Sequence, residues 1–140
     1  MKLAFYKAEF GDWSDKLISW YTNGPFSHVE MYFSNGECFS SSPRDGGTRW
    51  KVISDIEISG KWLFIDIPNI DETALRYLCN KQLGKKYDWL CIFLCNIIPF
   101  DIQDPKKWVC SEICAKLVLN LHHAFKYSPN SLFRRLSCPT

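Results

Sequence analysis

Residues 28–42 read HVEMYFSNGECFSSS, and this stretch decides the fold. Its first half alternates as a half-buried strand does, so His28 and Glu30 lie on the same face. Asn35-Gly36 then interrupts the alternation, and this dipeptide between two alternating runs is a strong signal for a β-hairpin. A two-residue turn there predicts a second strand from Glu37 to about Ser42, with Ser41 opposite Glu30. A β-bulge would shift this pairing by one residue.

Outward from this hairpin, strand patterns dominate the first half of the chain and helix patterns the second. We expect strands over 2–6, 48–54 and 62–67, a helix over 16–21 after capping residues at 12–15, and further helices over 71–83, 87–97 and 110–122. No repeat, low-complexity segment or linker divides the chain. The sequence therefore predicts a single α+β domain over residues 1–140, in which helices pack a small antiparallel sheet.

Composition excludes several classes of protein. The formal net charge is +2, and the basic residues are dispersed, so a nucleic-acid-binding surface is not expected. The longest apolar stretch, residues 89–100, is shorter than the roughly 20 residues that span a bilayer. Lys7 and Glu9 interrupt the N-terminal apolar residues, which argues against a signal peptide and predicts a cytoplasmic protein. The seven cysteines are an odd number, and we expect them to be reduced thiols.

Cys110 is the first candidate for chemistry. It stands where an apolar helical pattern begins, followed directly by Ser111 and Glu112. Free backbone N–H groups and the dipole at a helix start favour a thiolate, which is the reactive form of cysteine. The same backbone groups can stabilise an oxyanion.

His28 is the candidate general base for this thiol. His122 and His123 fall about three turns along the predicted Cys110 helix, roughly 18 Å away at about 1.5 Å per residue. Such a base usually needs a third polar group that orients its ring. Ser40 or Ser41 on the neighbouring strand is a candidate, and Glu30, on the same face as His28, is the charged alternative.

These motifs, in this order, resemble the permuted branch of the NlpC-type, papain-like hydrolases, which includes YiiX-like proteins and relatives of lecithin retinol acyltransferase. The resemblance covers nearly the whole chain. It rests on residues 24–30 (GPFSHVE), Asn35-Gly36 with 39–41 (FSS), 83–89 (LGKKYDW), 108–112 (WVCSE), and Ser128-Pro129 with Leu132. In that branch the histidine strand precedes the cysteine helix, as it does here.

The resemblance implies a circularly permuted papain-like fold and a cysteine-dependent hydrolase or acyltransferase. Its substrates would be peptide amides or acyl-lipid esters, and no metal or cofactor is expected. Members often carry His or Glu near the position of Ser40, so either the Ser40 hydroxyl or Glu30 takes that role here. We further expect Ser111 in the environment of the nucleophile, and Ser41, Tyr87 and Trp108 at the substrate site.

Two other functions remain open. Cys91 and Cys95, together with Cys110 and Cys114, have spacings that could bind a zinc ion from two facing helices. Alternatively, the chain is a catalytically inactive binding module of the same fold, an interpretation supported mainly by the serine at position 40.

Overall fold

The structure is a computed structural model that describes residues 1–88 and 107–138. Its centre is a seven-stranded sheet in the order β5-β1-β2-β3-β4-β6-β7. Neighbouring strands are antiparallel except β6 and β7, which are parallel. The strands are β1 (Lys2–Lys7), β2 (Phe26–Tyr32), β3 (Glu37–Ser42), β4 (Gly47–Val52), β5 (Trp62–Asp66), β6 (Lys86–Tyr87) and β7 (Lys107–Trp108).

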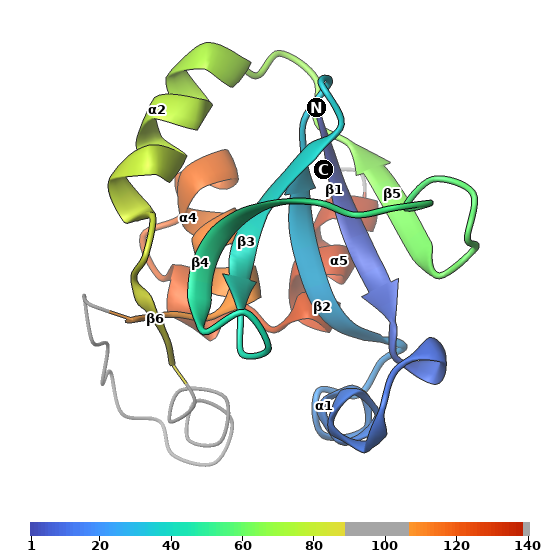
Figure 1. Cartoon of the computed structure of the whole chain (residues 1–140). Coiled ribbons are helices and arrows are strands. Elements are labelled where there is room, and N and C mark those ends of the chain that lie inside the picture. Colours follow the sequence, from blue (N-terminus) through green and yellow to red (C-terminus); the bar gives the residue numbers. More distant parts are fainter. Residues whose placement is uncertain (89–106, 139–140) are drawn as a thin grey trace.

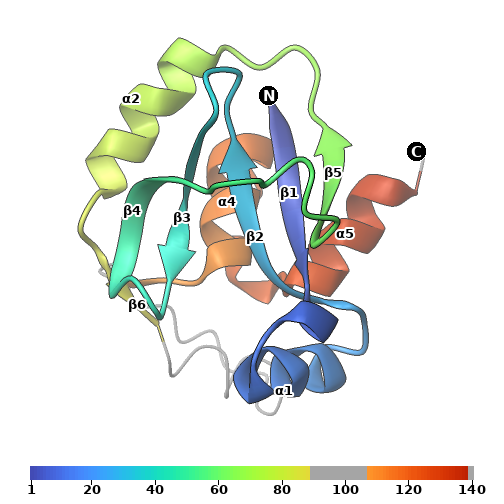
Figure 2. The same cartoon turned by 45° about the vertical axis from the view of Figure 1, so that its right-hand side comes forward.

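The helices are placed unevenly around this sheet. They are α1 (Trp13–Tyr21), α2 (Glu72–Gln82), α4 (Cys110–Leu119) and α5 (Pro129–Ser137), with short 3₁₀ turns η1 (Ala8–Phe10) and η2 (Ala124–Lys126). Helices α4 and α5 cover one face of the sheet, α2 lies beyond its β4 side, and α1 lies at one end (Figure 1). The turned view shows the same arrangement (Figure 2). The predicted α+β class is confirmed.

Side chains from both layers form the main core. Phe5, Val29 and Met31 of the sheet are fully buried and belong to one cluster with Ile113 of α4 and Leu132 of α5. The opposite face of the sheet has a smaller apolar cluster, formed by Ala4, Cys38 and Ile56. Helix α4 is thus anchored on the strand that carries His28.

The hairpin register differs by one residue from the pairing predicted for a two-residue turn, which is the size of shift that a bulge would produce. The Phe33 amide donates to the Glu37 carbonyl at 2.9 Å, and the Gly36 amide donates to the Phe33 carbonyl at 3.0 Å. The loop therefore has three residues, 34–36, and ends on Gly36 at φ 85°. Three-residue hairpins of this kind place a glycine in the left-handed conformation. The observed pairs are Met31 with Phe39 and Tyr32 with Cys38, so Ser41 is not opposite Glu30.

The helical half also departs from the prediction in several places. Helix α4 ends at Leu119 on Asn120, whose φ is 50°, so His122 and His123 lie beyond the helix. Tyr87 belongs to a strand rather than to a helix, and the remainder of the helix expected over 87–97 lies outside the described residues. Helix α5 was not predicted, although Ser128 caps it and Pro129 is its first residue.

Within residues 1–88 and 107–138, no helix has both the length and the apolarity that a membrane span requires.

Candidate active site

His28 lies where β2 and β3 separate. The two strands form ladder pairs only near the hairpin, at Met31 and Tyr32 of β2. Nearer to His28, the Val29 carbonyl instead accepts the Ser40 hydroxyl at 2.7 Å, and the Cys114 sulfur lies 4.0 Å from the same oxygen. Side-chain contacts thus take the place of backbone β-ladder hydrogen bonds here. His28, on this part of β2, can therefore face the start of α4.

Cys110 is the first residue of α4, and the segment ahead of it is tightly held. The Trp108 carbonyl accepts the Ser41 hydroxyl at 2.7 Å and the Asp88 amide at 3.2 Å. The Val109 amide donates to the Glu112 carboxylate at 3.4 Å, which satisfies a backbone group at the helix start. Cys110 itself is 2% exposed. These contacts fix the thiol at a helix N-terminus, as the sequence predicts.

The structure brings His28 and Cys110 together. Burial on its own would lower the pKa of His28, but the charge and hydrogen bond of Cys110, followed by those of Glu30, raise this pKa to about 10. His28 Nε2 lies 2.7 Å from Glu30 Oε1, so Nδ1 is the ring nitrogen left for the thiol. The imidazole therefore lies between a thiol and a carboxylate, which is the arrangement of a cysteine–histidine–acid triad.

Glu30 is the third member of this arrangement, and its environment keeps it ionised. Its carboxylate is fully buried and binds both terminal nitrogens of Arg49, at 2.8 Å and 2.6 Å. Burial opposes ionisation of Glu30, but the hydrogen bonds and charges of His28 and Arg49 outweigh it and lower its pKa. A bidentate guanidinium also fixes the orientation of the carboxylate. Glu30 can therefore hold the His28 ring in one tautomer.

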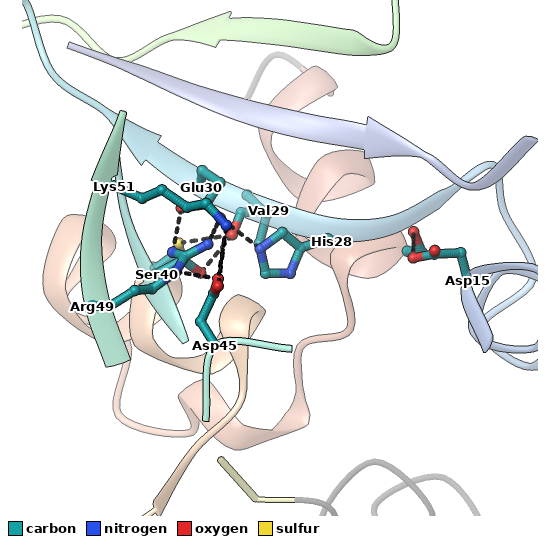
Figure 3. A network of polar contacts seen from close by, with 10 residues as sticks. Asp15, His28, Val29, Glu30, Ser40, Asp45, Arg49 and Lys51 are labelled. Carbon is teal, nitrogen blue, oxygen red and sulfur yellow. Dashed lines mark hydrogen bonds and ion pairs between the residues drawn. The ribbon is translucent and has the colours of Figure 1, made fainter. Parts of the chain in front are cut away.

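The charged chain continues on β4 and in the loop before it. Arg49 Nε donates to Asp45 at 2.7 Å, and Asp45 also accepts from Lys51 at 3.0 Å. The side chains of Lys51, Arg49 and Asp45 lie beside Glu30, on the side away from Asp15 (Figure 3). Arg49 faces Glu30 because β4 pairs with β3, with Arg49 opposite Ser40.

A second polar network lies on the other side of His28. Asp15 of α1 is 5% exposed and accepts the Ser27 hydroxyl at 2.7 Å. Arg44, in the loop between β3 and β4, donates to Asp15 and, at 2.8 Å, to Asp12. The network therefore joins this loop to α1 across the space in front of His28.

Two cavities meet at His28. One, of about 360 Å³, is lined by charged side chains that include Glu30, Arg49 and Lys61. The other, of about 190 Å³, lies between α1 and the sheet and is lined by Asp15, Ser27 and Tyr87 among others. Both include His28 and Arg44 in their walls, whereas Cys110 lines neither. In the described part of the chain, the histidine is thus the member of the pair that reaches open space.

The remaining predicted site residues are distributed as follows. Ser40 contacts the Val29 carbonyl rather than His28, so Glu30 and not Ser40 meets the imidazole. Ser41 is fully buried against Trp108, and neither residue is part of the two cavity walls, whereas Tyr87 is. Their hydroxyl and carbonyl groups instead hold the segment ahead of Cys110.

Ser111 follows Cys110 directly in α4, and its hydroxyl is in an unusual state. Its hydroxyl is fully buried and has no hydrogen-bond partner among the described residues. A buried hydroxyl of this kind carries an energetic cost. It is available as a donor close to Cys110, in keeping with its predicted place in the environment of the nucleophile.

Sequence reasoning missed Arg49 and Asp15. Arg49 sits in a run of alternating residues that resembles any edge strand, and only the register with β3 brings it to Glu30. Asp15 has the signature of a helix cap, because its carboxylate accepts the Asp12 amide at 3.0 Å. The capping pattern depends on neighbouring residues alone and does not indicate the second contact of Asp15, with Ser27.

Metal binding finds no support in the described residues, where no group of three or more His, Cys, Asp or Glu side chains could hold an ion. Cys91 and Cys95 of the predicted zinc set lie outside those residues, so that hypothesis is untested.

Comparisons with known proteins found no family model, no curated protein and no solved structure that matches this chain. Its function has to be inferred from the geometry and chemistry of the site.

Proposed function

We propose that this chain is a cysteine-dependent hydrolase or acyltransferase in which Cys110 is the nucleophile, His28 the general base and Glu30 the orienting acid. One observation carries the proposal: the His28 imidazole contacts Cys110 at a helix start and binds a buried carboxylate through Nε2. The order of these residues, with the histidine strand ahead of the cysteine helix, is also the order of the permuted papain-like branch that the sequence resembles.

The chemistry would proceed in two steps. His28 accepts the thiol proton, and the Cys110 sulfur attacks the carbonyl carbon of an amide or ester. The oxyanion forms near the backbone N–H groups at the start of α4. His28 then protonates the leaving amine or alcohol, so that a thioester remains on Cys110.

In the second step His28 takes a proton from water, or from an acceptor alcohol or amine. The resulting nucleophile attacks the thioester, and the sulfur leaves as a thiolate that recovers the proton from His28. The product is a carboxylic acid or a new ester or amide. Both peptide amides and acyl-lipid esters fit this scheme.

Glu30 weakens the case for the inactive alternative. That interpretation rested on a serine standing where relatives often place His or Glu. A carboxylate two residues from His28, on the same strand, supplies the missing contact at 2.7 Å.

The pH dependence of iodoacetamide alkylation, measured by mass spectrometry, tests the proposal. Below pH 7, well under the ordinary thiol pKa of about 8.5, we expect Cys110 to react faster than the exposed Cys138. In His28→Ala this advantage should disappear, whereas in His122→Ala, which removes an exposed histidine, it should persist. Slow labelling of Cys110 that does not depend on His28 would refute the proposal.

A further inference from the structure

Helix α1 is inverted with respect to the usual amphipathic pattern. Trp13, Leu17 and Trp20 fall on one face at helical spacing, and they are 77%, 40% and 78% exposed. The opposite face carries polar groups that are turned inward: Asp15 is buried, and the Ser19 hydroxyl donates to the Gly24 carbonyl at 2.6 Å. Ile18 lies on this inward face as well and lines the 190 Å³ cavity with Asp15. A surface helix normally turns its apolar stripe toward the core.

The exposed apolar surface extends beyond the helix. Phe10, which ends the 3₁₀ turn just before α1, is 48% exposed. We call Phe10, Trp13, Leu17 and Trp20 the α1 ridge. Contiguous apolar surface of this kind marks an interaction site, because leaving it in water is unfavourable. The ridge belongs to a helix at the end of the sheet, away from α2 and β4 (Figure 2).

Cations border the α1 ridge. Lys7 Nζ lies 6.0 Å from the centre of the Phe10 ring. Lys16 is three residues after Trp13 and four before Trp20, so it flanks both on the helix surface. At the far end, Arg134 donates to the Asn23 carbonyl at 3.0 Å.

The carboxylates of the same region are partly neutralised. Asp12 and Asp15 both accept from Arg44, whose single positive charge offsets one of their two negative charges. Glu9 forms no ion pair with any described residue. Lys7, Lys16 and Arg134 outnumber these remaining negative charges, so the border of the ridge has a small net positive charge.

We propose that the α1 ridge docks this protein onto the surface of an anionic phospholipid bilayer. Tryptophan favours the boundary between acyl chains and headgroups, because its ring is apolar and its N–H is polar. Flanking lysine and arginine side chains reach anionic headgroups. A helix with a short apolar stripe suits shallow insertion, with its axis in the membrane plane.

Docking in this way also orients the candidate active site. Asp15, on the inward face of α1, lines the same 190 Å³ cavity as His28. One face of the helix would therefore contact lipid while the other forms a wall of the cavity. The inference goes beyond the proposed hydrolase activity and does not require it.

Co-sedimentation with phospholipid vesicles tests this inference. The full chain should bind vesicles of phosphatidylcholine with about 30% phosphatidylglycerol, and bind pure phosphatidylcholine more weakly. The double variant Trp13→Ser/Trp20→Ser should lose at least about tenfold in affinity. Lys16→Glu should weaken binding to the anionic vesicles several-fold.

Matched variants separate this role from others. Tyr77 and Leu83, at α2, are 61% and 52% exposed, and Tyr77→Ser/Leu83→Ser should bind vesicles as the wild type does. Cys110→Ala should also bind normally, whether or not the chain is a hydrolase. The proposal is overturned if the wild type binds neither vesicle type, or if the α2 variant loses as much affinity as the α1 variant. Sedimentation equilibrium showing a dimer that only the α1 variant dissociates, without vesicle binding, would assign the ridge to a second copy of the chain instead.

Discussion

Two buried carboxylates flank His28, each paired with an arginine, and their surroundings give them different roles. Glu30 and Arg49 are both enclosed, with side chains 1% and 16% exposed. Asp15 is equally enclosed, at 7%, but its partner Arg44 is 56% exposed. The first pair is part of the sheet and touches the imidazole. The second spans the space between a loop and α1 and contacts Ser27 and Asp12 rather than the imidazole, so proximity to His28 does not by itself give an arginine–carboxylate pair a contact with the ring.

Replacing each arginine should give the largest difference between the two pairs, measured as a loss of unfolding free energy. We expect Arg49→Met to lower the free energy of unfolding by about 3–5 kcal/mol, because it leaves the Glu30 charge buried without its cation. Arg44→Met should cost about 1 kcal/mol or less, since the exposed guanidinium is already solvated. Urea denaturation measures both, and equal losses would contradict the comparison.

Removing each carboxylate charge should affect reactivity unequally. In Glu30→Gln the alkylation rate of Cys110 at pH 6 should fall by about tenfold, the effect of roughly 1.4 kcal/mol lost from the thiolate–imidazolium pair, because the ring loses the carboxylate that orients it and favours its charged form. Asp15→Asn should stay within about twofold of the wild type, because Asp15 does not touch the ring. Glu37→Gln, which removes a carboxylate paired with Arg76 away from His28, is the control. A loss in Asp15→Asn as large as that in Glu30→Gln would refute the assignment of Glu30.

Above pH 6, the pH dependence of stability should carry the signature of His28. The pKa of His28 is raised from 6.5 to about 10, so its stabilising contribution is fully present below pH 6.5 and is lost as the pH rises toward 10. Urea denaturation between pH 6 and pH 10 should show a falling unfolding free energy in the wild type and a smaller fall in His28→Ala. Identical slopes in the two proteins would contradict the raised pKa.

Glu30 contributes in the opposite direction. Its pKa is lowered, so its stabilising contribution is present above about pH 4.5 and is lost as the pH falls below that value. The fall on the acid side should be smaller in Glu30→Gln.

Salt should produce the smallest difference. At 1 M salt the screening length is about 3 Å, so the exposed Arg44 pair loses most of its attraction whereas a buried pair loses little. The stability gap between wild type and Arg44→Met should close at 1 M NaCl, and the gap for Arg49→Met should persist. Closure of both gaps would show that Glu30 and Arg49 are solvated like surface charges.

Much of the local structure was predictable from the sequence. Asp12 accepts from the amides of Ser14 and Asp15 at the start of α1, as its predicted capping role requires. Asp71 does the same for α2. The alternation from residue 28 onward is typical of a strand, and the structure has β2 there. Local signals suffice in these places because capping and alternation depend on residues within one turn or one strand.

The hairpin shows where such local reasoning fails. Asn35-Gly36 suits a two-residue turn, yet the chain closes with three loop residues and Gly36 at positive φ. A shift of one residue changes which side chains meet across strands. Ser41 is consequently turned to Trp108 rather than placed opposite Glu30.

The sequence by itself determined the α+β class, the strand position of His28 and the position of Cys110 at a helix start, because each depends on neighbours along the chain. Only the tertiary structure decided that Glu30 rather than Ser40 meets the imidazole, that Arg49 holds Glu30, and that the apolar stripe of α1 faces outward. These outcomes depend on strand pairing and layer packing between residues far apart in sequence. Periodicity assigns a residue to a face, but the partner on that face is set by how the whole sheet closes.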